Sequence, residues 1–234
     1  MKRIAALFRS TIGRKYIMAL SGAVLILYVI GHLAGNLQIF FGSEVINDYA
    51  KFLHSKPLLL WIARIGLLAM VGLHIGSAMS LDSGNRSARP VAYTQWNPTA
   101  ADYASRTMLM SGWIVAAFVI YHLLHFTARV PTINLTGQDF TTFRDSDGHP
   151  DVYRMLITGF RHPLVSMFYI IAVGLLSLHL SHGVSAAFQS LGIRNADWTP
   201  FLNRLARGFA VAVFLGYASI PAAVLLGLGR DAIP

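Results

Sequence analysis

Five long apolar stretches, separated by short polar segments, dominate the 234-residue chain. Each is long enough for a helix, rising about 1.5 Å per residue, to cross a hydrocarbon core about 30 Å thick. The stretches cover approximately residues 17–41, 58–81, 107–128, 164–188 and 205–228. The pattern predicts an all-α integral membrane protein with five transmembrane helices, in which residues 1–234 form a single membrane domain without internal repeats.

The composition agrees with a protein that is solvated by lipid. Hydrophobic residues make up 55% of the chain and charged residues only 12%, and the mean hydropathy is +0.54. A soluble domain carries about 25% charged residues. The chain has no cysteine, which excludes disulfides, cysteine-ligated iron–sulfur clusters and a heme attached covalently through a C-x-x-C-H motif.

The net charge of +9 is explained by membrane topology, because the basic residues flank the apolar stretches. With the N-terminus inside, the cytoplasmic segments are rich in bases, whereas bases and acids are balanced outside; this is the positive-inside pattern. The cytoplasmic bases would be Lys2, Arg3, Arg9, Arg14, Lys15, Arg86, Arg89, Arg106, Arg194, Arg204 and Arg207. Residues 1–16 are expected to lie as a basic segment on the inner surface. The basic residues are therefore expected to face membrane lipid, and nucleic-acid binding is not expected.

Histidines are the chemically distinctive residues within the apolar stretches. Polar groups at membrane depth are costly and usually functional. The first span carries one histidine, the second one, the third two and the fourth two: His32, His74, His122, His125, His179 and His182.

The depth of these histidines predicts two layers of paired imidazoles. His32, His74, His122 and His179 each lie about 15 residues, or roughly 22 Å, from the start of their span. Because successive spans run in opposite directions, His32 and His122 fall nearer the outer face, and His74 and His179 nearer the inner face. If the first four spans form a sequential four-helix bundle, each pair lies on a diagonal and can ligate a b-type heme.

A heme iron with two axial imidazoles has no open position for oxygen, so the predicted role is electron transfer. Two alternatives remain open at this point. The third and fourth spans each carry H-x-x-H, so His125 or His182 could replace its neighbour as the ligand. The histidines could also bind protons or ions in a heme-free anchor or transporter, although no inverted repeat supports a transporter.

The spacing of several motifs resembles that of a known family over essentially the whole chain: the diheme cytochrome b membrane subunit of succinate dehydrogenases and fumarate reductases. The motifs are Gly31-His32, Leu73-His74, the run from Arg106 through Gly112 to Tyr121-His122, Phe168-Tyr169 and Ser181-His182-Gly183. In that family a third-helix ligand follows a Ser/Thr-Gly step, here Ser111-Gly112, by ten residues, and a fourth-helix ligand follows Phe-Tyr by ten. The resemblance therefore implies His32 with His122 for an outer heme and His74 with His179 for an inner heme.

The resemblance also implies partners. The chain would anchor a flavoprotein subunit and an iron–sulfur subunit in the bacterial cytoplasmic membrane, with its N-terminus cytoplasmic, and link the tricarboxylic acid cycle to quinone, with menaquinone favoured over ubiquinone. No catalytic residue is expected in the chain itself. Some family members carry a glutamate two residues before the fourth-helix ligand as a proton path; here Ser177 occupies that position. The alternative within the same chemistry is a diheme quinone cytochrome that anchors a hydrogenase or a formate dehydrogenase.

Further polar residues are candidates for contacts with heme propionates or quinone. Arg14, Lys15 and Arg106 lie at the inner face, and Arg64 lies inside the second span near its outer end, where snorkelling to the surface is the alternative role. Asn36 stands one turn after His32 and would contact quinone, the outer histidine or a neighbouring helix. His125 and His182 would lie nearer the membrane surfaces than the ligands, in reach of propionates or quinone.

Overall fold

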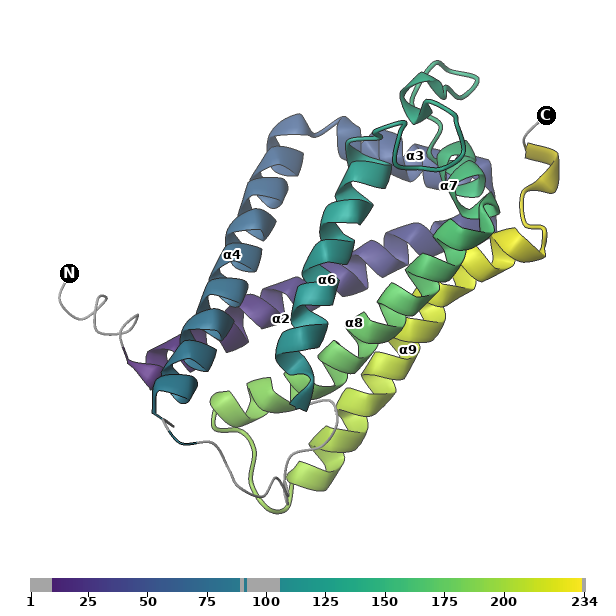
Figure 1. The fold of residues 1–234 in the computed structure, drawn as a ribbon. Helices are drawn as coiled ribbons and strands as arrows, with labels where there is room; N and C mark the ends of the chain where they lie inside the picture. The colour runs from purple at the N-terminus through teal and green to yellow at the C-terminus, as the bar shows by residue number, and fades with distance from the viewer. Residues whose placement is uncertain (1–9, 89–90, 92–105, 233–234) are drawn as a thin grey trace.

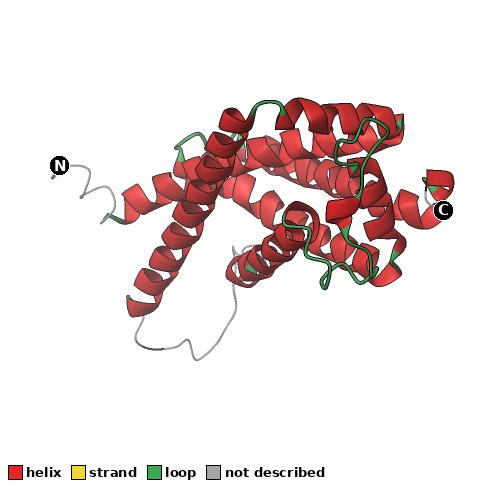
Figure 2. Cartoon of the chain, turned by 90° about the horizontal axis from the view of Figure 1, so that it is seen from above, coloured by secondary structure: helices red, strands yellow, loops and turns green. Residues whose placement is uncertain are grey.

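The computed structural model describes residues 10–88, 91 and 106–232. Its described part is helical, and Figure 2 shows no strand there. Five helices are long: α2 (Thr11–Asn36), α4 (Pro57–Ser87), α6 (Met108–His122), α8 (Pro163–Ser190) and α9 (Thr199–Leu226). Two are shorter: α3 (Ser43–His54) and α7 (Val152–Arg161). Short non-α turns are η1 (Leu37–Phe41), η2 (Leu123–Thr127), η3 (Phe140–Thr142) and η4 (Arg230–Ala232).

The prediction of five transmembrane helices is confirmed to the extent that five helices are long and apolar enough to cross a membrane. These candidate spans are Thr11–Phe41, Pro57–Ser87, Met108–Thr127, Pro163–Ser190 and Thr199–Leu226. The first begins earlier than expected, because the Ser10 hydroxyl caps α2 by accepting a hydrogen bond from the Gly13 amide at 3.0 Å. Residues 11–16 therefore belong to this helix, while residues 1–9 and Arg89 lie outside the described part.

The long helices pack unequally (Figure 1). Helix α2 packs against α4 and α8, α6 packs against α8, and α9 lies along α8 and also reaches α2. These contacts include three of the four neighbour pairs of a sequential four-helix bundle. The fourth pair, α4 and α6, does not pack closely, and none of the most apolar 18-residue stretch of α4 is buried.

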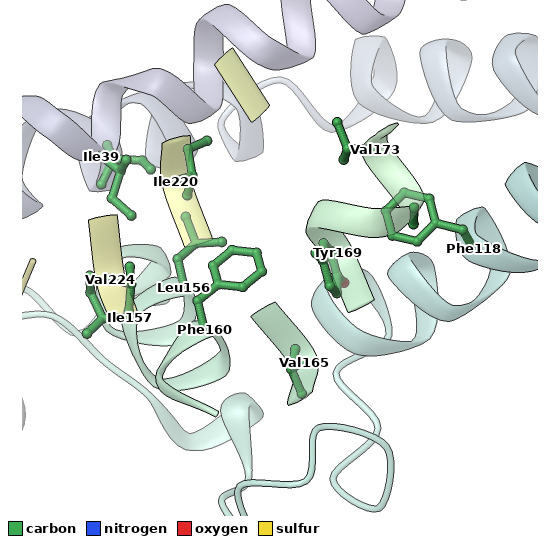
Figure 3. Packing of buried hydrophobic residues seen from close by; sticks show 12 residues of the cluster. Ile39, Phe118, Leu156, Ile157, Phe160, Val165, Tyr169, Val173, Ile220 and Val224 are labelled. Carbon is green, nitrogen blue, oxygen red and sulfur yellow. The ribbon is translucent and has the colours of Figure 1, made fainter. Parts of the chain in front are cut away.

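Helices α3 and α7 cover one end of the long helices, together with the irregular segment between α6 and α7 (Figure 1). We call it the α3–α7 end; the other is the α8–α9 turn end. The main apolar core lies towards the former, where Leu156, Ile157 and Phe160 of α7 meet Ile39 and Ile220 (Figure 3). Six consecutive residues of α7 are buried, from Met155 to Phe160. The core thus fixes a short helix across the ends of α2, α8 and α9.

One buried side chain ties α3 to α7. The Asn47 amide donates a hydrogen bond to Asp151 Oδ1 at 3.0 Å, and its carbonyl oxygen accepts one from the Tyr153 amide at 3.0 Å. Asp151 Oδ1 in turn accepts from the Arg154 amide at 2.9 Å and so caps α7. Asn47 thereby completes the N-terminus of a helix that is distant in sequence.

Replacing Asn47 by alanine is expected to lower the free energy of unfolding by about 1–3 kcal/mol, because it leaves the Tyr153 amide without its acceptor and removes one of the two donors to Asp151 Oδ1. Thermal unfolding of the purified protein in detergent measures the change. The exposed neighbour Asp48, changed to alanine, is the matched control and should have little effect. Equal unfolding temperatures for Asn47→Ala and the control would contradict this role for Asn47.

Candidate functional site

The structure brings His32 of α2 opposite His122, the last residue of α6. Their ring centroids lie 5.7 Å apart and the rings are nearly perpendicular, at 81°. We call these two residues the first histidine pair. It lies towards the α3–α7 end, where Tyr169 of the main core touches His122.

His74 of α4 and His179 of α8 form the second histidine pair, with ring centroids 6.4 Å apart at 65°. The side chain of His74 reaches Ser21 of α2, and that of His179 reaches Ser111 of α6. On each of these two helices the serine precedes the histidine of the first pair by eleven residues. At about 1.5 Å per residue the two pairs therefore lie at two depths roughly 16 Å apart.

The ring spacing within each pair fits a metal ion between two imidazoles. An imidazole nitrogen lies about 2.0 Å from a bound first-row metal, so two rings on opposite sides of one ion keep their centroids on the order of 6 Å apart. Both observed separations, 5.7 and 6.4 Å, are close to this value. In the described residues no group of three or more His, Cys, Asp or Glu side chains gathers, so a bare multi-ligand metal site is not indicated. A heme, which supplies four equatorial nitrogens itself, needs only the two imidazoles.

A local change of helix type separates His122 from His125. After His122 the chain continues as a π-helix, η2, in which the Ala128 amide donates to the Leu123 carbonyl five residues earlier. His122 faces His32, whereas His125 is turned to Phe126 and Tyr169 and is fully buried. His125 is therefore enclosed by protein side chains, and its expected contact with propionates or quinone stays a prediction.

The other H-x-x-H motif behaves similarly. His179 is paired with His74, whereas His182, one turn later on α8, is half-buried towards the α8–α9 turn end. The structure thus brings together the four histidines whose depth along the spans predicted pairing.

Hydrogen bonds hold the rings of the second pair at Nδ1. His74 Nδ1 lies 3.1 Å from the Met18 carbonyl and 3.4 Å from Ser21 Oγ. His179 Nδ1 lies 3.2 Å from Ser111 Oγ. Both serines are buried, with 3% and 5% of their surface exposed. In each ring Nε2 is the nitrogen that remains for a ligand.

The first pair has aromatic and amide neighbours. Tyr28 stacks on His32 at 5.4 Å, and Tyr217 of α9 lies 6.2 Å from the same ring. The Asn36 amide donates to the His32 carbonyl at 2.7 Å and lies 3.3 Å from both nitrogens of its ring. Asn36 therefore contacts the histidine of its own helix, as expected for a residue one turn later.

Two glycines allow the rings of the second pair to approach the helices. A Cβ at Gly22 would lie 3.2 Å from His74 Cε1, and one at Gly112 would lie 3.5 Å from His179 Cε1. By contrast, a Cβ at Gly31 or Gly76, next to His32 and near His74, would meet no atom within 4 Å. The helix surfaces beside these two histidines are therefore open and leave room for a flat group.

The charged candidates are placed differently from one another. The Arg14 guanidinium reaches from α2 to the Ser80 carbonyl of α4 at 3.3 Å and is half-buried. Lys15 and Arg106 are exposed. Arg64 is also exposed, and its guanidinium lies over the Trp61 ring at 5.1 Å. Of the three expected at the inner face, only Arg14 lies between two of the histidine-bearing helices.

The contacts of Ser21 with His74 and of Ser111 with His179 were not predicted from the sequence. A shared sequence pattern could have indicated them. Met18-x-x-Ser21-Gly22 and Met108-x-x-Ser111-Gly112 are the same pattern, and a histidine follows the glycine by ten residues in both, at His32 and His122. This short similarity is not a structural repeat, and the role of its serines follows from their contacts with His74 and His179.

Comparisons of the chain with protein-family models, with curated proteins and with solved structures find no match.

The contact between Tyr169 and His125 leads to a stability prediction. The Tyr169 hydroxyl lies 2.9 Å from His125 Nδ1, and the imidazole is 0% exposed. Tyr169→Phe should therefore reduce the free energy of unfolding by about 1–3 kcal/mol, because it leaves a ring nitrogen buried without a partner. In a His125→Phe background the same change should cost much less, which a double-mutant cycle in detergent measures. Identical costs in the two backgrounds would exclude this coupling.

Proposed function

We propose that the protein is the membrane-anchoring diheme cytochrome b subunit of a succinate:quinone oxidoreductase. The observation that carries the proposal is the pairing of four membrane-depth histidines into two facing pairs, 5.7 and 6.4 Å between ring centroids, at two depths. A histidine that served only to join two helices would not need a partner imidazole at this spacing. Two such pairs favour two metal-centred cofactors.

The chain would use both axial positions of each heme. When bound, a b-type heme supplies a reversible one-electron carrier, and two imidazole ligands leave it no open coordination site. The protein's own part is to present neutral imidazoles in a dry interior and to keep each ring at a set angle. His32 and His74 come from α2 and α4, and His122 and His179 from α6 and α8, so each cofactor would join the two helix pairs.

This placement also offers a reason for the loose association of α4 with α6. Helix α4 is held to the rest of the molecule mainly through α2, with a smaller contact to α3, and its most apolar stretch is unburied. Heme faces packed on the open surfaces near Gly31 and Gly76 would supply contacts that the side chains do not.

Succinate chemistry would reside on partner subunits. The chain has no cysteine for iron–sulfur clusters, so the family resemblance assigns the clusters to an iron–sulfur subunit and the substrate site to a flavoprotein. With the N-terminus inside, the α8–α9 turn end would face these partners in the cytoplasm of a bacterial cell, and the α3–α7 end would face outward. The charge distribution of the sequence supports this orientation.

Quinone would react close to one of the histidine pairs. Tyr28 of α2 stacks on His32, and Arg64 lies on the neighbouring helix α4 with its guanidinium over Trp61. The phenol beside an outer ligand is a suitable donor for a quinone carbonyl, and the exposed guanidinium on α4 is the second candidate. Menaquinone is the quinone favoured by the resemblance.

The decisive experiment is a cofactor count on the protein expressed in a heme-sufficient host. We expect two non-covalent b-type hemes per chain, a reduced-minus-oxidised spectrum of b type, and low-spin signals typical of two imidazole ligands. Co-purification of a flavoprotein and an iron–sulfur protein would support the succinate assignment. A heme-loaded complex with a hydrogenase or formate dehydrogenase head would reject that assignment, and a preparation without heme would reject the proposal as a whole.

Single ligand variants test the pairing. His74→Ala or His179→Ala should remove one heme, and His32→Ala or His122→Ala the other, so each variant should retain about half of the heme and one of two redox transitions. His125→Ala should retain both, because His125 faces Tyr169 instead of His32. Stepwise redox titration distinguishes selective loss from failed assembly. Loss of a heme in His125→Ala together with retention in His122→Ala would show the third-helix assignment to be wrong.

A further inference from the structure

We infer that Ser21 and Ser111 are matched positioning residues, which orient the imidazoles of His74 and His179 so that Nε2 of each ring faces the metal. The inference rests on the proposed function and extends it to residues outside the ligand set. Its support is a pair of contacts that occur twice in the molecule, each between a Ser-Gly step on one helix and a histidine on a neighbouring helix.

The acceptor of each serine hydroxyl determines which partner donates in the serine–histidine hydrogen bond. Ser21 Oγ donates to the Ile17 carbonyl at 2.7 Å and lies 3.1 Å from the Met18 carbonyl, both on its own helix. Ser111 Oγ likewise donates to the Met108 carbonyl at 3.1 Å. A hydroxyl has one hydrogen, and in both serines it is directed to the backbone of the same helix. The oxygen lone pairs are therefore what the histidines meet.

An imidazole that faces lone pairs must present an N–H. His74 Nδ1 faces two acceptors, the Met18 carbonyl at 3.1 Å and Ser21 Oγ at 3.4 Å, and His179 Nδ1 faces Ser111 Oγ at 3.2 Å. Both rings are thus held as the Nδ1–H tautomer, whose lone pair lies on Nε2. A hydrogen bond donated from Nδ1–H also increases the basicity of the ligating nitrogen.

The adjoining glycines complete the device. Gly22 and Gly112 follow the serines, and the missing Cβ at each lets an imidazole edge lie against the helix, with Cε1 at 3.2 and 3.5 Å from the Cβ position. Serine supplies the acceptor and glycine the space, so the two residue types are needed together. Because they occur on both α2 and α6, each histidine of the second pair has one serine and one glycine neighbour of this kind.

The serine contacts of His74 and His179 differ in one respect: only His74 has a second hydrogen-bond acceptor at Nδ1 among the described residues. The two serine substitutions are therefore expected to differ in effect. His74 keeps the Met18 carbonyl as an acceptor if Ser21 loses its hydroxyl. For His179, Ser111 is the hydrogen-bond acceptor that the described residues provide at Nδ1. Ser111→Ala should consequently have the larger effect.

The experiment compares Ser21→Ala, Ser111→Ala and Ser111→Thr in the purified full-length complex, by redox titration and low-temperature spectroscopy of the low-spin signals. Ser111→Ala should raise one midpoint potential, since a less basic ligand stabilises ferric iron less, and weaken retention of that heme by about 10-fold. The affected signal should be the one missing from His179→Ala. Ser21→Ala should shift the same signal by less, and Ser111→Thr, which keeps a hydroxyl, should restore the wild-type potential.

Ser219→Ala is the matched control, because Ser219 Oγ also bonds to its own helix, at Gly216, and lies on α9, which carries no histidine. If Ser111→Ala keeps two hemes and the midpoint potential of the heme that His179→Ala removes stays at its wild-type value, the inference is overturned. The proposed function would still stand. A wild-type protein without heme would overturn both. A shift in Ser219→Ala equal to that in Ser111→Ala would show a general packing effect and also reject the positioning role.

Discussion

An imidazole at membrane depth has two ring nitrogens to satisfy, and lipid satisfies neither. The arrangement of the long helices follows this constraint closely. At His74 and His179 one nitrogen is taken up by serine or carbonyl oxygen on a neighbouring helix, and at His122 the phenol of Tyr169 lies 3.5 Å from Nδ1. At His74 and His179 this leaves Nε2 without a hydrogen bond among the described residues. At His32 the Asn36 amide lies 3.3 Å from both ring nitrogens. Helix register, the Ser-Gly steps and the tyrosines therefore serve the same requirement.

The two ends of the molecule differ in how much of their apolar surface is buried by protein contacts. The α3–α7 end contains the main apolar core and a capped, hydrogen-bonded helix pair, so its shape is determined by protein contacts alone. Towards the α8–α9 turn end, α4 relies on α2, and few side chains are buried in either helix. The molecule is therefore densely packed at one end and leaves apolar helix surface open further along.

Much of this could be predicted from the sequence, and the reasons are physical. Five apolar runs predict five long helices, because backbone polar groups in lipid must be satisfied within the helix. The depth of His32, His74, His122 and His179 along antiparallel spans predicts which of them meet. Side-chain contacts that depend on rotation about the helix axis could not be predicted in this way. Sequence spacing alone does not give the acceptor for His179, the stacking of Arg64 on Trp61, or the burial of His125, since each depends on how far neighbouring helices turn and approach.

The π-helical turn after His122 has a consequence for how such a site changes over generations. It amounts to one extra residue in the helical ladder, so deleting one residue between Leu123 and Thr127 would return this last turn to α-helical spacing and change the direction of His125 relative to His122. A lineage that gained or lost that residue would re-aim His125 without altering the codons of the four paired histidines. Insertion and deletion, more than substitution, are then the mutational steps by which the environment of the neighbouring imidazole can be remodelled.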